Sequence, residues 1–154
     1  IVDSALLDEL RDFWYSRFFK NDYLLADEPV PGAAAYCRDV KARGGRVVYV
    51  TGRDESMRPG TLTTLKRHDF PSLDQDSIML KPRFDTSDVE FKAAAIERLN
   101  LMGWVAGSFE NEPAHSNLFQ NAFPQSRVFL LDTKHSGKPI VPHPTTQWIK
   151  DFRR

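Results

Sequence analysis

Apolar residues recur along the chain with two periods, one typical of helices and one typical of strands. In residues 4–19 they return every three or four positions, which predicts an amphipathic helix. The stretch "RVVYV", residues 46–50, is continuously apolar and rich in β-branched residues after its first position, which predicts a buried strand. By the same criteria we predict further helices at 33–43, within 54–71, and at 86–101, 113–122 and 145–152, and strands at 77–80, 104–109 and 127–132.

The order of these elements predicts the fold class. Strands that alternate with helices are typical of a parallel sheet whose two faces are covered by helices. We therefore predict an α/β fold, a three-layer Rossmann-like parallel sheet, in a single domain spanning residues 1–154. The loop at residues 22–32 is too short to hold a substantial cap domain.

Several element boundaries carry local signals. Ser87 and Glu90 form a capping box at the start of one helix, and Pro113 suits the first turn of another. In the first helix, four aromatic residues are predicted to pack in the core, with a homodimer face as the alternative. These aromatic residues are Phe13, Trp14, Phe18 and Phe19.

Composition narrows the classes of protein. The 154 residues include 21 basic and 21 acidic side chains, so the formal net charge is zero and gives no general attraction for nucleic acid. The single cysteine excludes a disulfide within the chain. No apolar run reaches the roughly 18 residues that span a membrane, and no signal peptide is visible, so we expect a cytoplasmic protein.

Polar residues follow each predicted strand. Thr51-Gly52-Arg53 comes after the first, Lys81 after the second, the acids of "ENE", residues 110–112, after the third, and Asp132 after the apolar part of the fourth. In open α/β sheets, ligands bind beyond the carboxyl ends of the strands. A hydroxyl, an ammonium group and carboxylates at one edge are suited to a phosphate group and a divalent cation.

These motifs in this order resemble the haloacid dehalogenase (HAD) superfamily. The resemblance implies a Mg²⁺-dependent phosphohydrolase in which Thr51 and the amide that follows bind the transferring phosphoryl group. Gly52 lets the backbone approach that group, and Arg53 holds substrate or shapes the loop. For the lysine that offsets the phosphate charge there are two candidates, Lys92 in "SDVEFK" and Lys81 in "IMLKP", and we favour Lys92.

The resemblance also implies metal ligands at the end of the third strand. Glu110 stands at the family's acidic position, with Glu112 as a second ligand, although the family commonly has aspartate there. The structural alternative is that both acids only complement the dipole of the helix that follows. The four histidines lack metal-binding spacing, and we expect them at the surface. For His135 and His143 the alternative is that they contact the substrate. The histidines are His68, His115, His135 and His143.

One family motif is missing. HAD phosphohydrolases carry D-x-D on the central strand, where the first aspartate becomes an aspartyl phosphate. Here only Asp3, in "IVDS", stands near the N-terminus, and no aspartate follows two residues later. We therefore expect the nucleophile and its strand to lie upstream of Ile1.

The implied activity is that of a nearly capless phosphatase or phosphotransferase acting through an aspartyl phosphate. Its partner would be a phosphorylated substrate, either a small molecule or a macromolecular end. The alternative is a non-catalytic HAD-like binding or scaffold domain that has lost its nucleophile.

Overall fold

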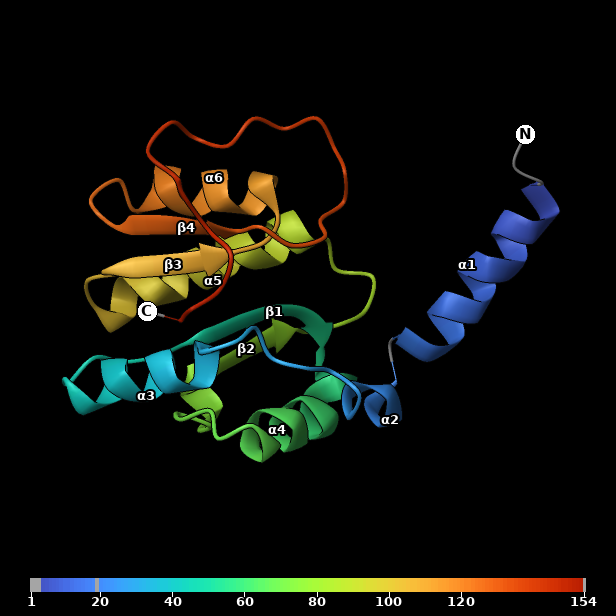
Figure 1. Ribbon diagram of the computed structural model, residues 1–154, viewed down its shortest axis with the longest axis horizontal. Helices are drawn as coiled ribbons and strands as arrows, with labels where there is room; N and C mark the ends of the chain where they lie inside the picture. Colours follow the sequence, from blue (N-terminus) through green and yellow to red (C-terminus); the bar gives the residue numbers. More distant parts are fainter. Residues whose placement is uncertain (1–3, 19, 154) are drawn as a thin grey trace. The chain divides into compact units, whose positions relative to one another are not determined.

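The computed structural model describes residues 4–18 and 20–153, and the fold is α/β as predicted (Figure 1). Every strand pairing is parallel, with β1 beside β2 in one sheet and β3-β4-β5 in another. The chain forms two compact units, one of Ile1–Pro29 with Ala34–Asp85 and one of Val30–Ala33 with Thr86–Arg154. That residues 1–154 form a single domain stays a prediction.

The first unit holds the two-stranded sheet and most of the helices. Its core contains Leu24, Met57 and the apolar residues of the second strand. The elements in chain order are α1 (Ser4–Phe18), α2 (Asn21–Leu24), α3 (Ala33–Ala42), β1 (Tyr49–Asp54), the 3-10 helix η1 (Glu55–Met57), α4 (Arg58–Arg67), the 3-10 helix η2 (Gln75–Ser77) and β2 (Ile78–Lys81).

The first strand lies further along the chain than its composition predicts. β1 begins at Tyr49 and includes Thr51-Gly52-Arg53, whereas we predicted a strand at residues 46–50. Tyr49 pairs with Ile78, at the start of the four-residue β2, so residues 46–48 have no partner in this ladder. The prediction was wrong because a neighbouring strand, rather than apolar composition, sets where a ladder begins.

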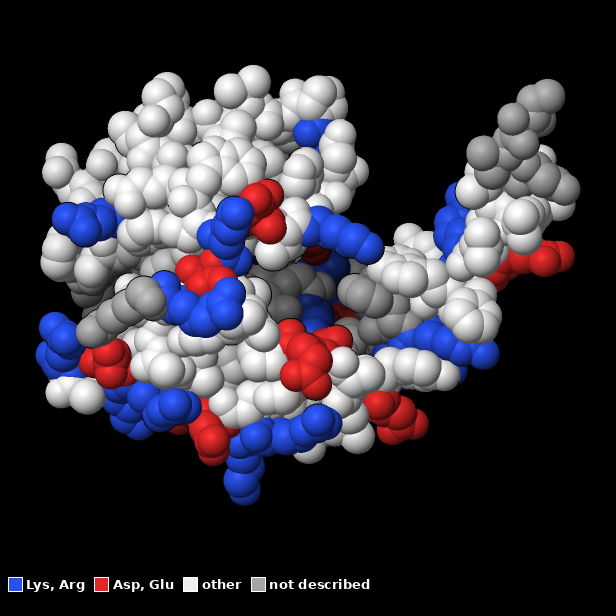
Figure 2. Space-filling model, viewed as in Figure 1, with Lys and Arg blue, Asp and Glu red and all other residues white. Residues whose placement is uncertain are grey.

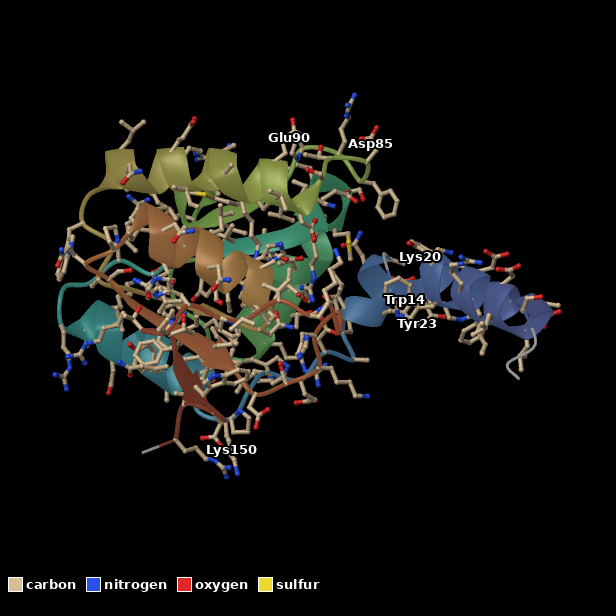
Figure 3. The ribbon with its side chains drawn as sticks, turned by 90° about the horizontal axis from the view of Figure 1, so that it is seen from above. Trp14, Lys20, Tyr23, Asp85, Glu90 and Lys150 are labelled. Carbon is tan, nitrogen blue, oxygen red and sulfur yellow. The ribbon has the colours of Figure 1, made fainter. Side chains whose placement is uncertain are left out.

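Helix α1 lies on the surface. Every residue from Ser4 to Ser16 is exposed, and the side chains of Phe13 and Trp14 keep about half of their surface, 57% and 46%. The prediction that these two rings pack in the core was therefore wrong. Phe19 lies outside the described residues, as does Asp3. Figure 3 shows Trp14, Lys20 and Tyr23 near the junction of α1 and α2.

The short helix α2 was predicted as a loop, and it holds the start of α4. Asn21 donates a hydrogen bond to the carbonyl of Ser56 (2.9 Å) and accepts one from the amide of Gly60 (2.7 Å). Because the first amides of a helix lack partners within it, this side chain satisfies a group that would otherwise need water. A Cβ on Gly60 would lie 2.6 Å from the Asn21 Oδ1, so a larger residue would displace the Asn21 side chain.

The second unit holds the three-stranded sheet. Helix α6 packs against β3 and β4, and α5 contacts α6. The buried apolar residues of this unit include Phe91, Ile96, Phe119, Val128 and Leu130. The elements are α5 (Asp88–Met102), β3 (Gly107–Glu110), α6 (Pro113–Ala122), β4 (Arg127–Leu131) and β5 (Gln147–Ile149).

The two helices of this unit begin where their sequence signals predict. Ser87 caps α5, because its hydroxyl accepts a hydrogen bond from the amide of Glu90 (3.1 Å). Figure 3 shows Glu90 pointing away from the helix. Pro113 is the first residue of α6, where the missing amide hydrogen costs nothing.

The last predicted helix is a strand. Residues 145–152 were expected to be helical, but Gln147–Ile149 form β5, which pairs in parallel with β4 through Trp148 opposite Leu130. The segment completes the sheet edge beside β4, and this tertiary pairing overrides the local pattern.

No helix in the described part of the chain is long and apolar enough to cross a membrane. Acidic and basic side chains are interspersed over α3 and α4 on the face in view (Figure 2), as a formal net charge of zero would suggest.

Candidate functional site

Thr51, Gly52 and Arg53 lie in an irregular part of β1. Thr51 is paired with Leu80 and Asp54 with Lys81, so Gly52 and Arg53 form a bulge between two paired positions. Bulges redirect the backbone and often lie next to functional sites. The Thr51 hydroxyl oxygen accepts a hydrogen bond from the Arg53 amide (3.3 Å), which shapes this turn.

Arg53 is held within the first unit. Its guanidinium forms an ion pair with Asp27 and donates a hydrogen bond to the Thr61 hydroxyl (3.4 Å). The two charged side chains keep 30% and 45% of their surface, so water screens the pair. These contacts support the role of shaping the loop, one of the two that the family resemblance implies for Arg53.

The bulge leads directly into a capped turn. Asp54 is buried, and its carboxylate accepts a hydrogen bond from the amide of Ser56 (2.8 Å) at the start of η1. This is the usual capping role of an aspartate. The chain therefore leaves β1 in a fixed direction.

Lys81 ends β2 and is buried. Its ammonium group donates a hydrogen bond to the carbonyl of Phe84 (3.2 Å) and lies 5.9 Å from the centre of the Phe84 ring. These partners are local, and they hold the lysine side chain against the turn that follows β2. Lys81 is therefore not a solvated side chain at the strand end.

In the second unit, Lys92 and Glu110 form a buried ion pair. Their side chains keep only 7% and 10% of their surface. Lys92 comes from the second turn of α5 and Glu110 from the last position of β3, so the pair joins helix and sheet at the carboxyl end of the strand. The structure thus brings together two residues that the sequence analysis selected separately.

His115 belongs to the same group of charges, and the sequence analysis placed it at the surface. It is half-buried on the first turn of α6. Burial lowers the pKa of its imidazole below the ordinary value, and the positive charge of Lys92 lowers it further, against the opposing carboxylates led by Glu110. The sequence feature that could have placed His115 near this ion pair is its position five residues after Glu110, on the helix that follows the strand.

Glu112 faces a different partner. One carboxylate oxygen accepts a hydrogen bond from the Ser136 amide (2.9 Å) and the other accepts from the Ser136 hydroxyl (2.7 Å). Burial raises the pKa of Glu112, but these two hydrogen bonds and the charges of His115 and His135 outweigh it, so the pKa lies below the ordinary range. The role of Glu112 as a metal ligand stays a prediction.

The side chains that would hold Mg²⁺ are partly present. Among residues 4–18 and 20–153, no three His, Cys, Asp or Glu side chains are grouped as a metal site. Mg²⁺ is commonly bound through one or two carboxylates, while water and phosphate oxygens complete its shell. Glu110 fits as one such ligand. One of its carboxylate oxygens accepts the hydrogen bond from Lys92, and the other oxygen is the one that would bind the metal.

Comparison with known proteins identifies the family. A family profile described as HAD superfamily, subfamily IIIB (acid phosphatase), matches residues 15–105, which is more than half of the chain. The match includes Thr51, Lys81 and Lys92 and ends before Glu110. No curated protein and no solved structure matches significantly. The chain, which has parallel strands and carries T-G-R within β1, therefore belongs to the HAD superfamily, in the subfamily of the acid phosphatases.

Proposed function

We propose that the protein hydrolyses phosphate monoesters in a Mg²⁺-dependent reaction through an aspartyl phosphate, with the nucleophilic aspartate upstream of Ile1. The acid phosphatase family supports a phosphatase-type hydrolase. The observation that carries the finer proposal is the buried Lys92–Glu110 pair at the carboxyl end of β3.

A buried ion pair is a poor way to stabilise a fold. Removing two charges from water costs several kcal/mol for each ion, and apolar residues of similar size often serve stability equally well or better. Buried ionisable groups beside a strand end are instead frequent at functional sites. The family resemblance assigns chemistry to both members of this pair, which a purely structural role would leave unexplained.

In this proposal each residue has a stated task. The Lys92 ammonium offsets negative charge on the phosphoryl group and the nucleophile, and it holds the Glu110 carboxylate in position. The Thr51 hydroxyl and the amide after it donate hydrogen bonds to phosphoryl oxygens. Bound Mg²⁺, with Glu110 as a ligand, would neutralise charge on the phosphate oxygens.

The test is phosphate release from p-nitrophenyl phosphate by the full-length protein, with Mg²⁺ and with EDTA. We expect activity that EDTA abolishes and that Thr51→Ala lowers by about 10²-fold or more, since one donor to a developing oxyanion is worth about that much. Thr63→Ala is the matched control, because Thr63 is exposed and its hydroxyl donates only to the Pro59 carbonyl of its own helix. Activity that is indifferent to EDTA, or unchanged in Thr51→Ala, contradicts the proposal.

A further inference from the structure

The segment between β4 and β5 is a long connection, residues 132–146, that side chains near the start of α6 hold in place. Asn111 donates a hydrogen bond to the carbonyl of Lys134 (3.0 Å), and Glu112 accepts two from Ser136. Further along, Asn117 donates to the carbonyl of Val141 (2.9 Å) and accepts from the amide of His143 (2.7 Å). We call this segment the β4–β5 loop.

These contacts fix the loop beside the proposed site. Asn111 and Glu112 directly follow Glu110, the last residue of β3, and Asn117 lies one turn further along α6. Two of the three side chains therefore anchor the loop within two residues of Glu110. A loop of this length without regular structure is unusual in a compact protein and is commonly functional.

The β4–β5 loop is cationic. Asp132 is its first residue, and no other residue of the loop is acidic, whereas the loop contains Lys134, His135 and Lys138. All three side chains are exposed. Two lysines against one aspartate give the loop a formal charge of +1, whereas the formal net charge of the whole chain is zero.

Glu112 is the strongest of the anchors. Both of its oxygens are used by Ser136, and hydrogen bonds to a charged group contribute more than neutral ones. A carboxylate that holds a backbone amide and a hydroxyl in this way orients the loop that carries them. This geometry describes a positioning residue more directly than a metal ligand.

We propose that Glu112 positions the β4–β5 loop, and that the loop's Lys134, His135 and Lys138 form a subsite for a second anionic group of the substrate. The subsite favours phosphate esters that carry a further phosphate or carboxylate. The proposal rests on the proposed function only in that the ligand is a phosphate ester. The anchoring of the loop by Glu112 is independent of turnover.

The anchoring is tested by amide hydrogen exchange of the full-length protein and three variants. Glu112→Ala removes both bonds, and we expect exchange of the Ser136 amide to rise about tenfold or more. Glu112→Gln keeps an acceptor for the amide and offers a donor to the hydroxyl oxygen, so exchange stays near wild type. Ser136→Ala loses only the hydroxyl bond and should lie between the two.

The same variants separate positioning from metal binding. If Glu112 positions the loop, Glu112→Gln keeps the wild-type Mg²⁺ concentration dependence, whereas Glu112→Ala raises KM for a doubly anionic substrate more than it lowers kcat. If Glu112 is a metal ligand, Glu112→Gln is as damaging as Glu112→Ala, and Ser136→Ala has no effect. That second pattern, or unchanged exchange in Glu112→Ala, overturns the role of Glu112.

The subsite is tested by binding of tripolyphosphate and orthophosphate, measured by calorimetry without turnover. We expect the wild-type protein to bind tripolyphosphate with a lower Kd than orthophosphate. In the double variant Lys134→Gln/Lys138→Gln the ratio of the two Kd values should shrink about fivefold to tenfold, since two charge-assisted contacts are lost. An unchanged difference overturns the subsite. This binding measurement is independent of hydrolysis. A protein that does not hydrolyse phosphate esters but binds tripolyphosphate more tightly than orthophosphate would contradict the proposed function and still support the subsite.

Discussion

The two units each contain an ion pair that ties a strand end to another segment, and the two pairs differ in exposure. Arg53 and Asp27 keep 30% and 45% of their side-chain surface, whereas Lys92 and Glu110 keep 7% and 10%. The first pair is partly exposed to water, which weakens the attraction between its two charges and lowers the free-energy cost of breaking the pair. The second pair is largely shielded from water, so each charge is stabilised mainly by the opposite charge.

This difference indicates what each pair contributes. The Arg53–Asp27 pair orients the bulge of β1, and Arg53 also donates a hydrogen bond to Thr61, so the pair is one of several contacts around this strand end. The Lys92–Glu110 pair links the start of α5 to the end of β3 through one buried ion pair. Variants that break one pair at a time should therefore give unequal effects.

The largest effect is expected for Lys92→Met. The variant leaves the Glu110 carboxylate buried without its partner, and we expect a loss of about 3–5 kcal/mol in the free energy of unfolding. Urea denaturation at pH 7.5 measures it. Lys150→Met, at an exposed lysine of the same unit (Figure 3), is the control and should change stability by less than about 0.5 kcal/mol. A loss below about 1 kcal/mol for Lys92→Met would mean that water reaches the pair.

A smaller effect is expected for Gly60→Ala, which tests whether Asn21 is a stronger anchor than the exposed ion pair. The added Cβ would lie 2.6 Å from Asn21 Oδ1 and 3.0 Å from its Cα, so the side chain must move and lose its two hydrogen bonds. We expect a loss of about 1–3 kcal/mol despite the better helix propensity of alanine. Thermal unfolding is the measurement. A variant that is more stable than wild type would show that Asn21 can move aside without loss of stability.

The Arg53–Asp27 pair should contribute less. For Asp27→Asn we expect a change below about 1 kcal/mol, because both side chains are partly exposed and the Thr61 contact of Arg53 remains. The change should shrink further in 0.5 M NaCl, since salt screens exposed charges. A loss equal to that of Lys92→Met would remove the distinction between the two pairs.

The smallest effect concerns pH. Since the pKa of His115 is lowered from 6.5 in the folded protein, the unfolded chain binds more protons as the pH falls below about 6.5. His115 therefore contributes stability above that pH which is lost on acidification. Urea midpoints at pH 7.5, 6.0 and 5.0 should decline less steeply in His115→Gln than in wild type, and parallel declines would exclude this contribution.

The sequence predicts elements best where local signals agree with tertiary structure. Helix α6 has its predicted bounds, and Ser87 caps α5, because proline and serine act within one turn of the chain. Strand boundaries depend on partners distant in sequence. Residues 46–48 lack a partner in the β1–β2 ladder, and Trp148 pairs with β4 although its neighbours suggest a helix.

The candidate site shows the same limit. The family resemblance selects Lys92 and Glu110, and the structure joins them in one ion pair. The link between Glu112 and Ser136 spans 24 positions and has no signature in either segment, because it depends on the path of an irregular loop. Asp27 as the partner of Arg53 was missed for the same reason.

The double variant Lys92→Met/Glu110→Leu in the full-length protein tests whether the buried ion pair serves hydrolysis rather than stability. Replacing both charges by apolar residues should leave the free energy of unfolding near the wild-type value, because no charge remains buried without a partner. We expect this folded variant to lose Mg²⁺-dependent hydrolysis of p-nitrophenyl phosphate by about 10³-fold or more in kcat/KM. A double variant that is stable and hydrolyses the ester within about threefold of wild type would contradict a role in hydrolysis, and the pair would be structural.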